Sequence, residues 1–271
     1  MKTTFTFLLL VIALPACVCG HPGVGIVRDT RGNIFYTDLA QVWKIDPAGK
    51  RTVAVAHVHT HELYLDEHDN LFGEHLWYNG EQRNTWGHFV WRLSASGQYE
   101  KIIPDTEGFR QGYSFVRDQM GHHYYADRQG ACQTIYRLDV HGQKQKHTPT
   151  CFHRVGWMYA NAQGDLIFTD RQQLKTITSS GVRTIASWKR GAMGVWMDSR
   201  GNLYAACYED QQVKCFDPAG RALSVIQTEG GWHPSGGLTE PDGTLWILEN
   251  NANNHVRVER VRPAGQRTVW P

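Results

Sequence analysis

The chain lacks the features that mark several large classes of protein. Its 28 basic and 26 acidic residues leave a formal net charge of +2, and no run of like charges stands out. A nucleic-acid footprint or a polybasic membrane patch is therefore unsupported. No segment shows a sustained helical period, and the sequence contains no Ser-His-Asp order, Gly-x-Ser-x-Gly elbow, phosphate loop or dinucleotide fingerprint. Nucleophilic and nucleotide-dependent catalysis thus have no support from sequence motifs.

A hydrophobic run long enough to span a bilayer is also missing. The apolar stretch over residues 5–15, which follows Lys2, is too short and has the form of a signal peptide. Residues 1–20 are expected to be removed, leaving a mature protein of residues 21–271 that is secreted or periplasmic. In the alternative, residues 14–17 form a lipoprotein box, Cys17 carries a lipid anchor and Cys19 becomes an unpaired thiol.

Cysteines are few, and cleavage after Gly20 leaves an even set of four, which favours that site. If residues 141 and 142 form a two-residue hairpin turn, cross-strand partners sum to 283, which pairs Cys132 with Cys151. Cys207 and Cys215 flank a short loop between neighbouring strands, and a second disulfide is predicted there. The alternative is a metal thiolate site, which the spacing and an oxidising compartment disfavour.

What the sequence does contain is a repeat. Six copies of a Gly- or Asp-centred turn interrupt strand-like apolar runs, for example at residues 32–35, 201–204 and 243–246, with a mean period of about 42 residues. This period predicts an all-β protein, a six-bladed β-propeller with four antiparallel strands per blade. The expected blades cover approximately residues 24–57, 58–109, 110–152, 153–187, 188–230 and 231–271.

The repeat resembles the six-bladed propellers of the NHL-repeat and senescence-marker-protein/gluconolactonase group. The resemblance rests on Gly25-x-x-x-Asp29-x-x-Gly32-Asn33 and on Gly194-x-x-x-Asp198-x-x-Gly201-Asn202. It implies a site where the inner strands begin, which in gluconolactonase-like members holds a divalent cation on Glu, Asn and Asp oxygens. This chain departs from that set, because the position before each inner-strand glycine reads Val24, His61, Tyr113, Val155, Met193 and Ser235.

Histidine and glutamate replace those ligands. Blades two, four and six each carry a histidine three positions before the glycine slot, and blade two adds more; the candidate metal ligands are His59, His61, Glu62, His75, His153 and His233. Imidazole and carboxylate groups in this arrangement predict one divalent transition metal, namely zinc, copper or iron. The alternative is that these histidines are hydrogen-bonding wall residues without a metal.

Blade two also contains an aromatic insertion, which could stack a planar or sugar-like ligand. Its alternative is an enlarged hairpin whose aromatic side chains pack on neighbouring blades. Basic residues near the same rim, including Lys189 and Arg190, would accommodate an anionic ligand such as a carboxylate or an acidic sugar. The candidate ligand-binding residues are Trp77, Tyr78, Trp86, Tyr113, Arg154 and Glu249.

These features predict an exported propeller that binds a small ligand or a transition metal at a His- and Glu-rich channel mouth centred on blade two. The first alternative is a metal-dependent hydrolase of lactones or esters, with Glu62 or Glu74 as the general base. The second is a protein-interaction platform on the same rim, as in many NHL-type propellers.

Overall fold

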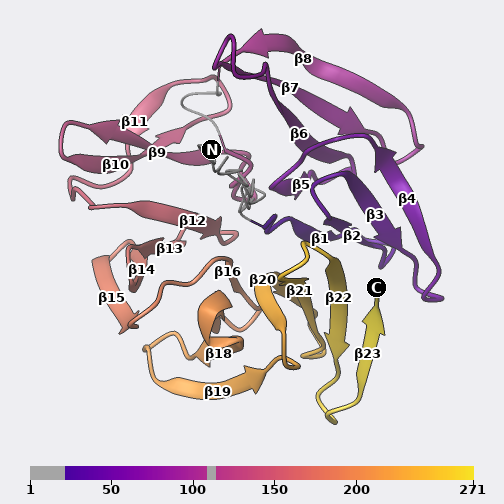
Figure 1. Ribbon diagram of the computed structural model, residues 1–271. Helices are drawn as coiled ribbons and strands as arrows, with labels where there is room; N and C mark the ends of the chain where they lie inside the picture. Colours follow the sequence, from indigo (N-terminus) through magenta and orange to yellow (C-terminus); the bar gives the residue numbers. More distant parts are fainter. Residues whose placement is uncertain (1–21, 109–113) are drawn as a thin grey trace, which may run out of the picture.

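The computed structural model describes residues 22–108 and 114–271 and consists of six small antiparallel sheets arranged around a central axis (Figure 1). The sheets follow one another along the chain, and each strand pairs with its neighbour in sequence. Blades one and two contain β1 (Ile26–Arg28), β2 (Ile34–Thr37), β3 (Gln41–Ile45) and β4 (Arg51–Ala56), then β5 (Leu63–Leu65), β6 (Leu71–Tyr78), β7 (Trp86–Leu93) and β8 (Tyr99–Glu107).

Blade three contains β9 (His123–Gln129), β10 (Cys132–Leu138) and β11 (Lys144–Lys146). Blade four contains β12 (Val155–Ala160), β13 (Leu166–Asp170), β14 (Gln173–Thr178) and β15 (Gly181–Ser187). Blade five contains β16 (Val195–Met197), β17 (Leu203–Cys207), the 3-10 helix η1 (Tyr208–Asp210), β18 (Gln212–Phe216) and β19 (Ala222–Gln227). Blade six contains β20 (Trp232–Thr239), β21 (Leu245–Asn251), β22 (Val256–Val261) and β23 (Arg267–Trp270).

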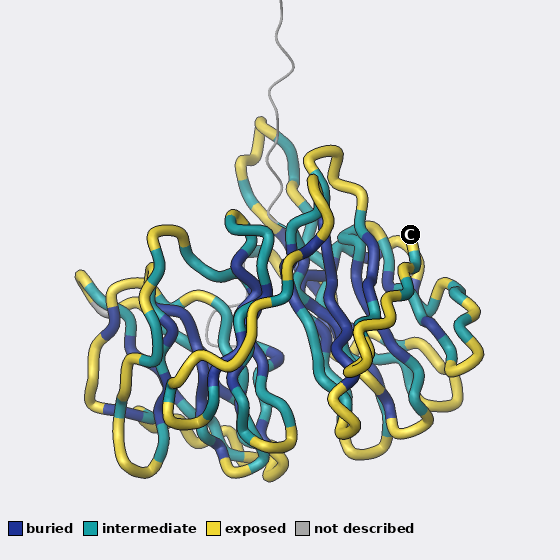
Figure 2. Tube along the Cα trace, turned by 90° about the horizontal axis from the view of Figure 1, so that it is seen from below, coloured by how far each residue is buried: buried dark blue, intermediate teal, exposed yellow. Residues whose placement is uncertain are grey.

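The predicted six-bladed β-propeller is therefore confirmed, with four strands in five of the blades. Blade three has three strands, and its inner position is occupied by a single bridge between Arg117 and His123. Buried residues lie along the middle of the strands, and the turns at both ends of the blades are exposed (Figure 2).

The Asp and Asn of the repeated motif hold the turn between the first and second strands of a blade. In blade one, Asp29 accepts hydrogen bonds from the backbone N–H of Asn33 at 2.7 Å and from its side-chain amide at 2.6 Å. Gly32 between them has a φ of 84°, which glycine adopts without strain. The same pair of bonds recurs in blades two and five, so the motif specifies a turn rather than a binding site.

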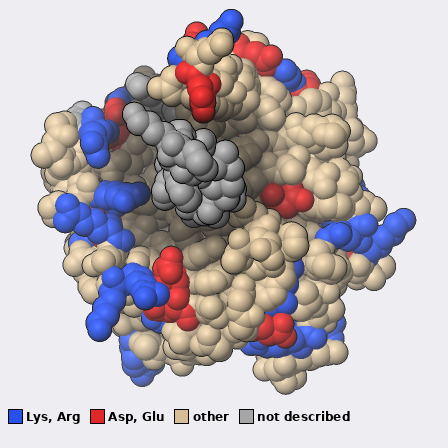
Figure 3. Space-filling model, in the orientation of Figure 1, with Lys and Arg blue, Asp and Glu red and all other residues tan. Residues whose placement is uncertain are grey.

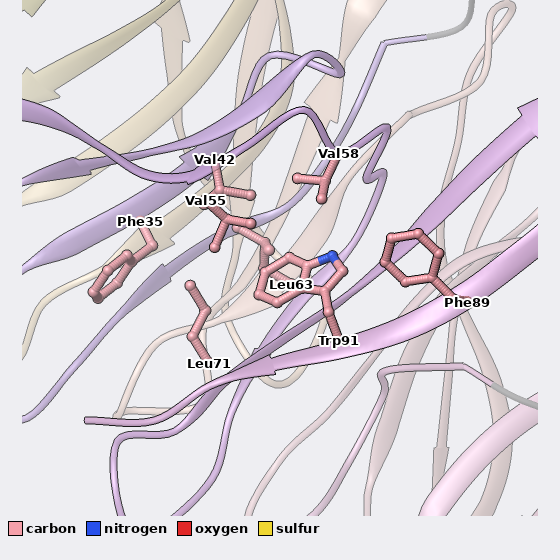
Figure 4. Close-up of a cluster of buried hydrophobic side chains, with 8 residues drawn as sticks. All are labelled: Phe35, Val42, Val55, Val58, Leu63, Leu71, Phe89 and Trp91. Carbon is pink, nitrogen blue, oxygen red and sulfur yellow. The ribbon is translucent and has the colours of Figure 1, made fainter. Parts of the chain in front are cut away.

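Apolar side chains from neighbouring blades pack together between the sheets. Between blades one and two, Phe35, Val42 and Val55 meet Leu63, Leu71, Phe89 and Trp91, with Val58 from the connection (Figure 4). Trp91 is fully buried and lies over Gly73, where an added Cβ would come within 2.2 Å of its ring. A larger residue at position 73 would therefore displace the largest side chain of this cluster.

The ring closes by contacts between blades six and one. All four strands of blade six come from the C-terminal part of the chain, so among the described residues no N-terminal strand completes it. The Ser235 hydroxyl donates a hydrogen bond to the Gly23 carbonyl at 2.8 Å, and the Trp270 indole N–H donates to the Gly49 carbonyl at 2.9 Å. A shared apolar cluster of Ile26, Ile34, Tyr36, Ile45, Trp246, Leu248 and Val258 fills the same interface.

One of the two predicted disulfides is confirmed. Cys132 and Cys151 are bonded, with their Cα atoms 5.9 Å apart. The predicted pairing of the hairpin strands, in which the numbers of opposite residues sum to 283, is off by one. Tyr136 lies opposite Lys146, so the numbers of opposite residues sum to 282. The bond lies near the other end of β10, beside the bridge between Gln133 and Phe152.

The predicted bond between Cys207 and Cys215 is wrong, since both are buried free thiols. In the β17–β18 ladder, Cys207 lies opposite Gln212, and Cys215 is three residues beyond Gln212. Successive side chains of a strand alternate between the faces of the sheet, so the two sulfurs lie on opposite faces. Burial raises the pKa of the Cys207 thiol to about 11, which keeps it protonated and unreactive at neutral pH.

In the part of the chain that the structure covers, no helix has the length and apolar character needed to cross a membrane. The predicted signal peptide and Cys17, with its alternative lipid anchor, lie outside the described residues.

Candidate functional site

The inner strands of neighbouring blades approach one another closely at the end of the channel where these strands begin. A Cβ on Gly194 would lie 2.4 Å from the Ser235 carbonyl oxygen, and one on Gly236 would lie 2.3 Å from that of Val24. A Cβ on Gly25 would similarly lie 2.9 Å from the backbone nitrogen of Leu63. The glycine slot of the repeat thus allows neighbouring backbones to meet around the channel.

These inner strands enclose a cavity of about 450 Å³ along the axis of the propeller. All six blades contribute to its wall, through β1, β5, residues 115–117, β12, β16 and β20 or the residues beside them. The aromatic residues along the wall include Tyr64, Phe115, Trp157 and Tyr159. Ligand sites of this size typically combine such an apolar wall with a few polar groups.

One of those polar groups is Glu62, which occupies the glycine slot of blade two. Its carboxylate accepts a hydrogen bond from the backbone N–H of Phe115 in blade three at 3.3 Å. Burial raises the pKa of Glu62, while the Phe115 N–H and the positive charge of Arg117 act in the opposite direction. A carboxylate therefore stands at this slot, where Gly25, Gly194 and Gly236 allow a close backbone approach in other blades.

Three more charged residues line the cavity. Arg117 donates to the backbone carbonyl of Ser114 at 2.6 Å, and its guanidinium lies 5.7 Å from the ring centre of Tyr64. Arg28 lies 3.6 Å from Glu240, whose other oxygen accepts a hydrogen bond from the Trp246 indole at 2.6 Å. The cavity thus presents two cationic and two acidic side chains to a ligand.

Sequence reasoning identified Glu62 but missed Arg28, Tyr64, Arg117, Trp157 and Glu240. Each lies on or directly beside an inner strand, a few residues after the slot that the repeat marks. Aligning the whole inner strand of every blade, rather than its first two positions, would have brought these positions into the comparison without showing which of them face the axis.

The histidines of blade two form a hydrogen-bonded wall beside the mouth. The Nδ1 atom of His75 accepts from the backbone N–H of His59 at 2.9 Å, and its ring stacks on Phe89 at 4.8 Å. Burial and the nearby His59 and Lys101 lower the pKa of His75, so it is neutral at pH 7. The rings of His59 and His61 contact each other at 4.7 Å, and Nδ1 of His61 lies 3.9 Å from the Glu74 carboxylate.

The other candidate ligands lie elsewhere. His153 is exposed at the start of blade four. His233, in blade six, stacks on the ring of Tyr208 of blade five at a centroid distance of 4.7 Å, and its Nδ1 atom is hydrogen-bonded to the Tyr208 carbonyl. Over residues 22–108 and 114–271, no three His, Cys, Asp or Glu side chains are placed to hold a metal ion. The slots that carry the Asn and Asp ligands in gluconolactonase-like members hold Val155 and Met193. Valine and methionine supply no oxygen ligand at those two slots.

The insertion of blade two is a long hairpin formed by β6 and β7. Trp77 packs inward, 6.1 Å from Phe89 and 5.7 Å from His75, over Gly87, where a Cβ would meet its ring at 2.2 Å. Tyr78 and Trp86 pair at a ring distance of 5.1 Å and are 42% and 38% exposed. One tryptophan therefore serves packing, and the aromatic pair near the tip is accessible.

The remaining candidate ligand residues occupy three different environments. Tyr113 lies outside the described residues, and Arg154 is exposed at the rim. Glu249 is fully buried within blade six and is bonded to Arg257 at 2.5 Å. Burial raises the pKa of Glu249 to about 7, although Arg257 opposes the shift. Glu249 is not part of the cavity wall.

The fold and the cavity define the class: a six-bladed propeller with a ligand-sized cavity on its axis, charged and aromatic along its wall. Solved structures with a similar fold include virginiamycin B lyase from Staphylococcus aureus, with a TM-score of 0.56 and 15% identity over 92% of this chain and 84% of that one. A gluconolactonase from Xanthomonas campestris has a TM-score of 0.55 and 17% identity over 83% and 81%. Regucalcin from Agrobacterium tumefaciens, described as a calcium-binding protein, has a TM-score of 0.57 and 13% identity over 84% and 81%.

These similarities confirm the resemblance to gluconolactonase-like propellers at the level of the fold. No protein-family model matches the sequence, and no curated protein matches it. Function therefore has to be inferred from the site itself.

Proposed function

We propose that this protein binds a small, polyhydroxylated ligand in the central cavity, which the ligand enters at the end where the inner strands begin. The observation that carries this proposal is the cavity of about 450 Å³ with Glu62, Arg28, Arg117 and Glu240 on its wall. Sugar hydroxyls both donate and accept hydrogen bonds, so they can bind to carboxylate and guanidinium groups together. Tyr64 and Trp157 supply aromatic surface for the apolar face of a sugar ring.

This proposal moves the site of the sequence prediction from the rim of blade two into the channel. Blade two still contributes to it, through Glu62 and Tyr64. The wall formed by His59, His61 and His75 would then shape the entrance. Its metal-binding role stays a prediction, and no step of the proposed function involves a metal.

Calorimetric titration tests the proposal with gluconate, gluconolactone, cellobiose and digalacturonate as probes. We expect at least one of them to bind, and Tyr64→Ala to weaken its binding about tenfold through loss of stacking area. Trp86→Ala, at the exposed tip of the hairpin, is the matched control and should bind as the original does. Equal weakening by both variants, or an effect of Trp86→Ala alone, would place the ligand on the hairpin instead.

A second candidate is hydrolysis of a lactone or ester without a metal, whereas the sequence predicted a metal-dependent form of this reaction. It is favoured by Glu62, because a buried carboxylate with a raised pKa within the cavity is suited to general acid–base chemistry. In this hypothesis Glu62 would take a proton from the attacking water. Turnover of gluconolactone above the spontaneous rate, abolished in Glu62→Gln and insensitive to chelator, would support it. Turnover abolished by chelator would instead support the metal-dependent form.

We also propose that the protein is exported. The disulfide between Cys132 and Cys151 supports this, because such bonds persist in oxidising compartments. The intact mass of the protein recovered outside the cytoplasm tests it: cleavage after Gly20 predicts a chain beginning at His21. A lipid increment on Cys17 would show the alternative processing.

A further inference from the structure

Four basic residues surround the mouth of the channel on one side. Arg154 directly precedes β12, Arg171 directly follows β13, and Lys189 and Arg190 lie in the connection that leads to β16. All four are exposed. We call them the basic arc. None of the four lines the cavity itself; they lie on blades four and five at the end where β12 and β16, which do line it, begin.

Hydrogen bonds fix the loops of the basic arc against one another. The backbone N–H of Arg171 donates to the Arg154 carbonyl at 3.0 Å, and the Gln172 side chain donates to the Lys189 carbonyl at 2.7 Å. Asp170 is buried beneath them and accepts from the backbone N–H groups of His153 and Arg154 at 3.1 and 3.0 Å. The four cations are thus held on adjoining, connected loops.

The positive charge of the arc is little neutralised within the protein. Arg190 lies 3.6 Å from Glu209, but both side chains are about 60% exposed, so this pair is weak. Among the described residues, Arg154, Arg171 and Lys189 have no acidic side chain within ion-pair distance. In Figure 3, Lys and Arg gather to the left of the central depression, with acidic groups beside them at the lower left and others on the right margin.

Two arginines lie deeper in the cavity, whose wall also carries Glu62 and Glu240. Arg117 and Arg28 lie on its wall, each three positions after the glycine slot at which the inner strand of its blade begins. An anion attracted to the arc would meet these guanidinium groups after entry, and guanidinium binds carboxylate with matching geometry. Clefts lined by one sign of charge also raise the rate of entry for ligands of the opposite sign.

We propose that the ligand of the channel is a carboxylated sugar, of the uronic-acid class, and that the basic arc captures it and selects it over neutral sugars. This inference rests on the proposed function and narrows its ligand class. The carboxylate is bound by the arc and then by Arg117 or Arg28, and the sugar ring packs against the aromatic wall.

Digalacturonate and its dimethyl ester provide a matched pair of probes, because they share one skeleton and differ in charge. In calorimetric titrations at low salt, about 20 mM, we expect the acid to bind about tenfold more tightly than the ester, and at about 200 mM the difference should shrink severalfold. The triple variant Arg154→Glu, Arg171→Glu, Lys189→Glu should lose this preference.

A second triple variant controls for the change in net charge. Lys50→Glu, Arg200→Glu and Arg262→Glu alter three exposed residues in the turns at the opposite end of the blades. This control should keep the preference for the acid. Thermal unfolding of both variants, compared with the original protein, verifies that each is folded.

The outcomes separate this inference from the proposed function. Equal binding of acid and ester would overturn the inference and leave the channel proposal standing. An equal loss of preference in both triple variants would also overturn it, because the effect would then come from net charge alone. If neither probe bound, the uronic-acid inference would fail, and the titrations with gluconolactone and cellobiose would decide whether the channel proposal fails with it.

Discussion

The interface between blades six and one and the interface between blades two and three use the same position of the inner strand differently. At the first, Gly236 lets two backbones meet, and a hydroxyl bond and a shared apolar cluster complete the closure of the ring. At the second, Glu62 takes the glycine slot and bonds to Phe115 through its carboxylate. The same position of the repeat therefore lets the ring close between blades six and one, and it places a charged group in the cavity between blades two and three.

The strongest way to break this comparison is to put a side chain into the closing interface. Gly236→Ala would place a Cβ 2.3 Å from the Val24 carbonyl oxygen, and neither backbone can move without opening the ring. We expect a loss of about 3 kcal/mol or more in the free energy of unfolding, measured in urea. Gly230→Ala is the control, because nothing lies within 4 Å of the added atom. Similar effects of the two substitutions would contradict the account of the glycine slot.

Blade three offers a second comparison, since its sheet has three strands and a disulfide. Cys151→Ser should lower the free energy of unfolding by about 3 kcal/mol, because the bond closes a loop of about 20 residues in the unfolded chain. Cys215→Ser removes no cross-link and should cost about 1 kcal/mol. Alkylation of the denatured, unreduced mature protein should modify two thiols. Modification of none would show that Cys207 and Cys215 are bonded after all.

The buried carboxyl group of Glu249 in blade six adds a comparison through pH. The pKa of Glu249 is raised from 4.5 to about 7, so the folded state binds this proton more tightly than the unfolded state. The stability linked to that proton is complete below about pH 4.5 and is lost as the pH rises towards about 7.

Glu249→Gln cannot ionise and should escape this loss. Between about pH 5 and pH 8, its free energy of unfolding should improve relative to the original protein by about 2 kcal/mol. Urea unfolding at each pH measures this difference. Glu229 is the exposed partner of Arg257, and Glu229→Gln should change the free energy of unfolding far less across this pH range. A flat difference across this range would contradict the assignment.

The fold could be predicted from sequence because its determinants are local and repeated. Asp29, Gly32 and Asn33 specify a turn within five residues, and the same pattern at a period of about 42 counts the blades. Ring closure depends on contacts between residues more than 200 positions apart, such as Ser235 with Gly23, which a repeat does not reveal.

The site could be predicted only in part. Glu62 was identified because it breaks the repeat at the slot itself. Arg28 ends a three-residue strand and Arg117 forms a single bridge, so alternation does not tell which side chains face the axis. The disulfide of Cys207 and Cys215 failed for a related reason, since a shift of one residue in register exchanges the faces of a strand.

The central claim is that the ligand occupies the channel, and fluorine NMR of protein labelled with 5-fluorotryptophan tests it most directly. The chain has ten tryptophans, and single Trp→Phe variants assign each signal. On addition of digalacturonate, the account predicts a shift at Trp157, on the cavity wall, and none at Trp86 near the tip of the hairpin. Shifts at Trp77 and Trp86, with Trp157 unchanged, would contradict it.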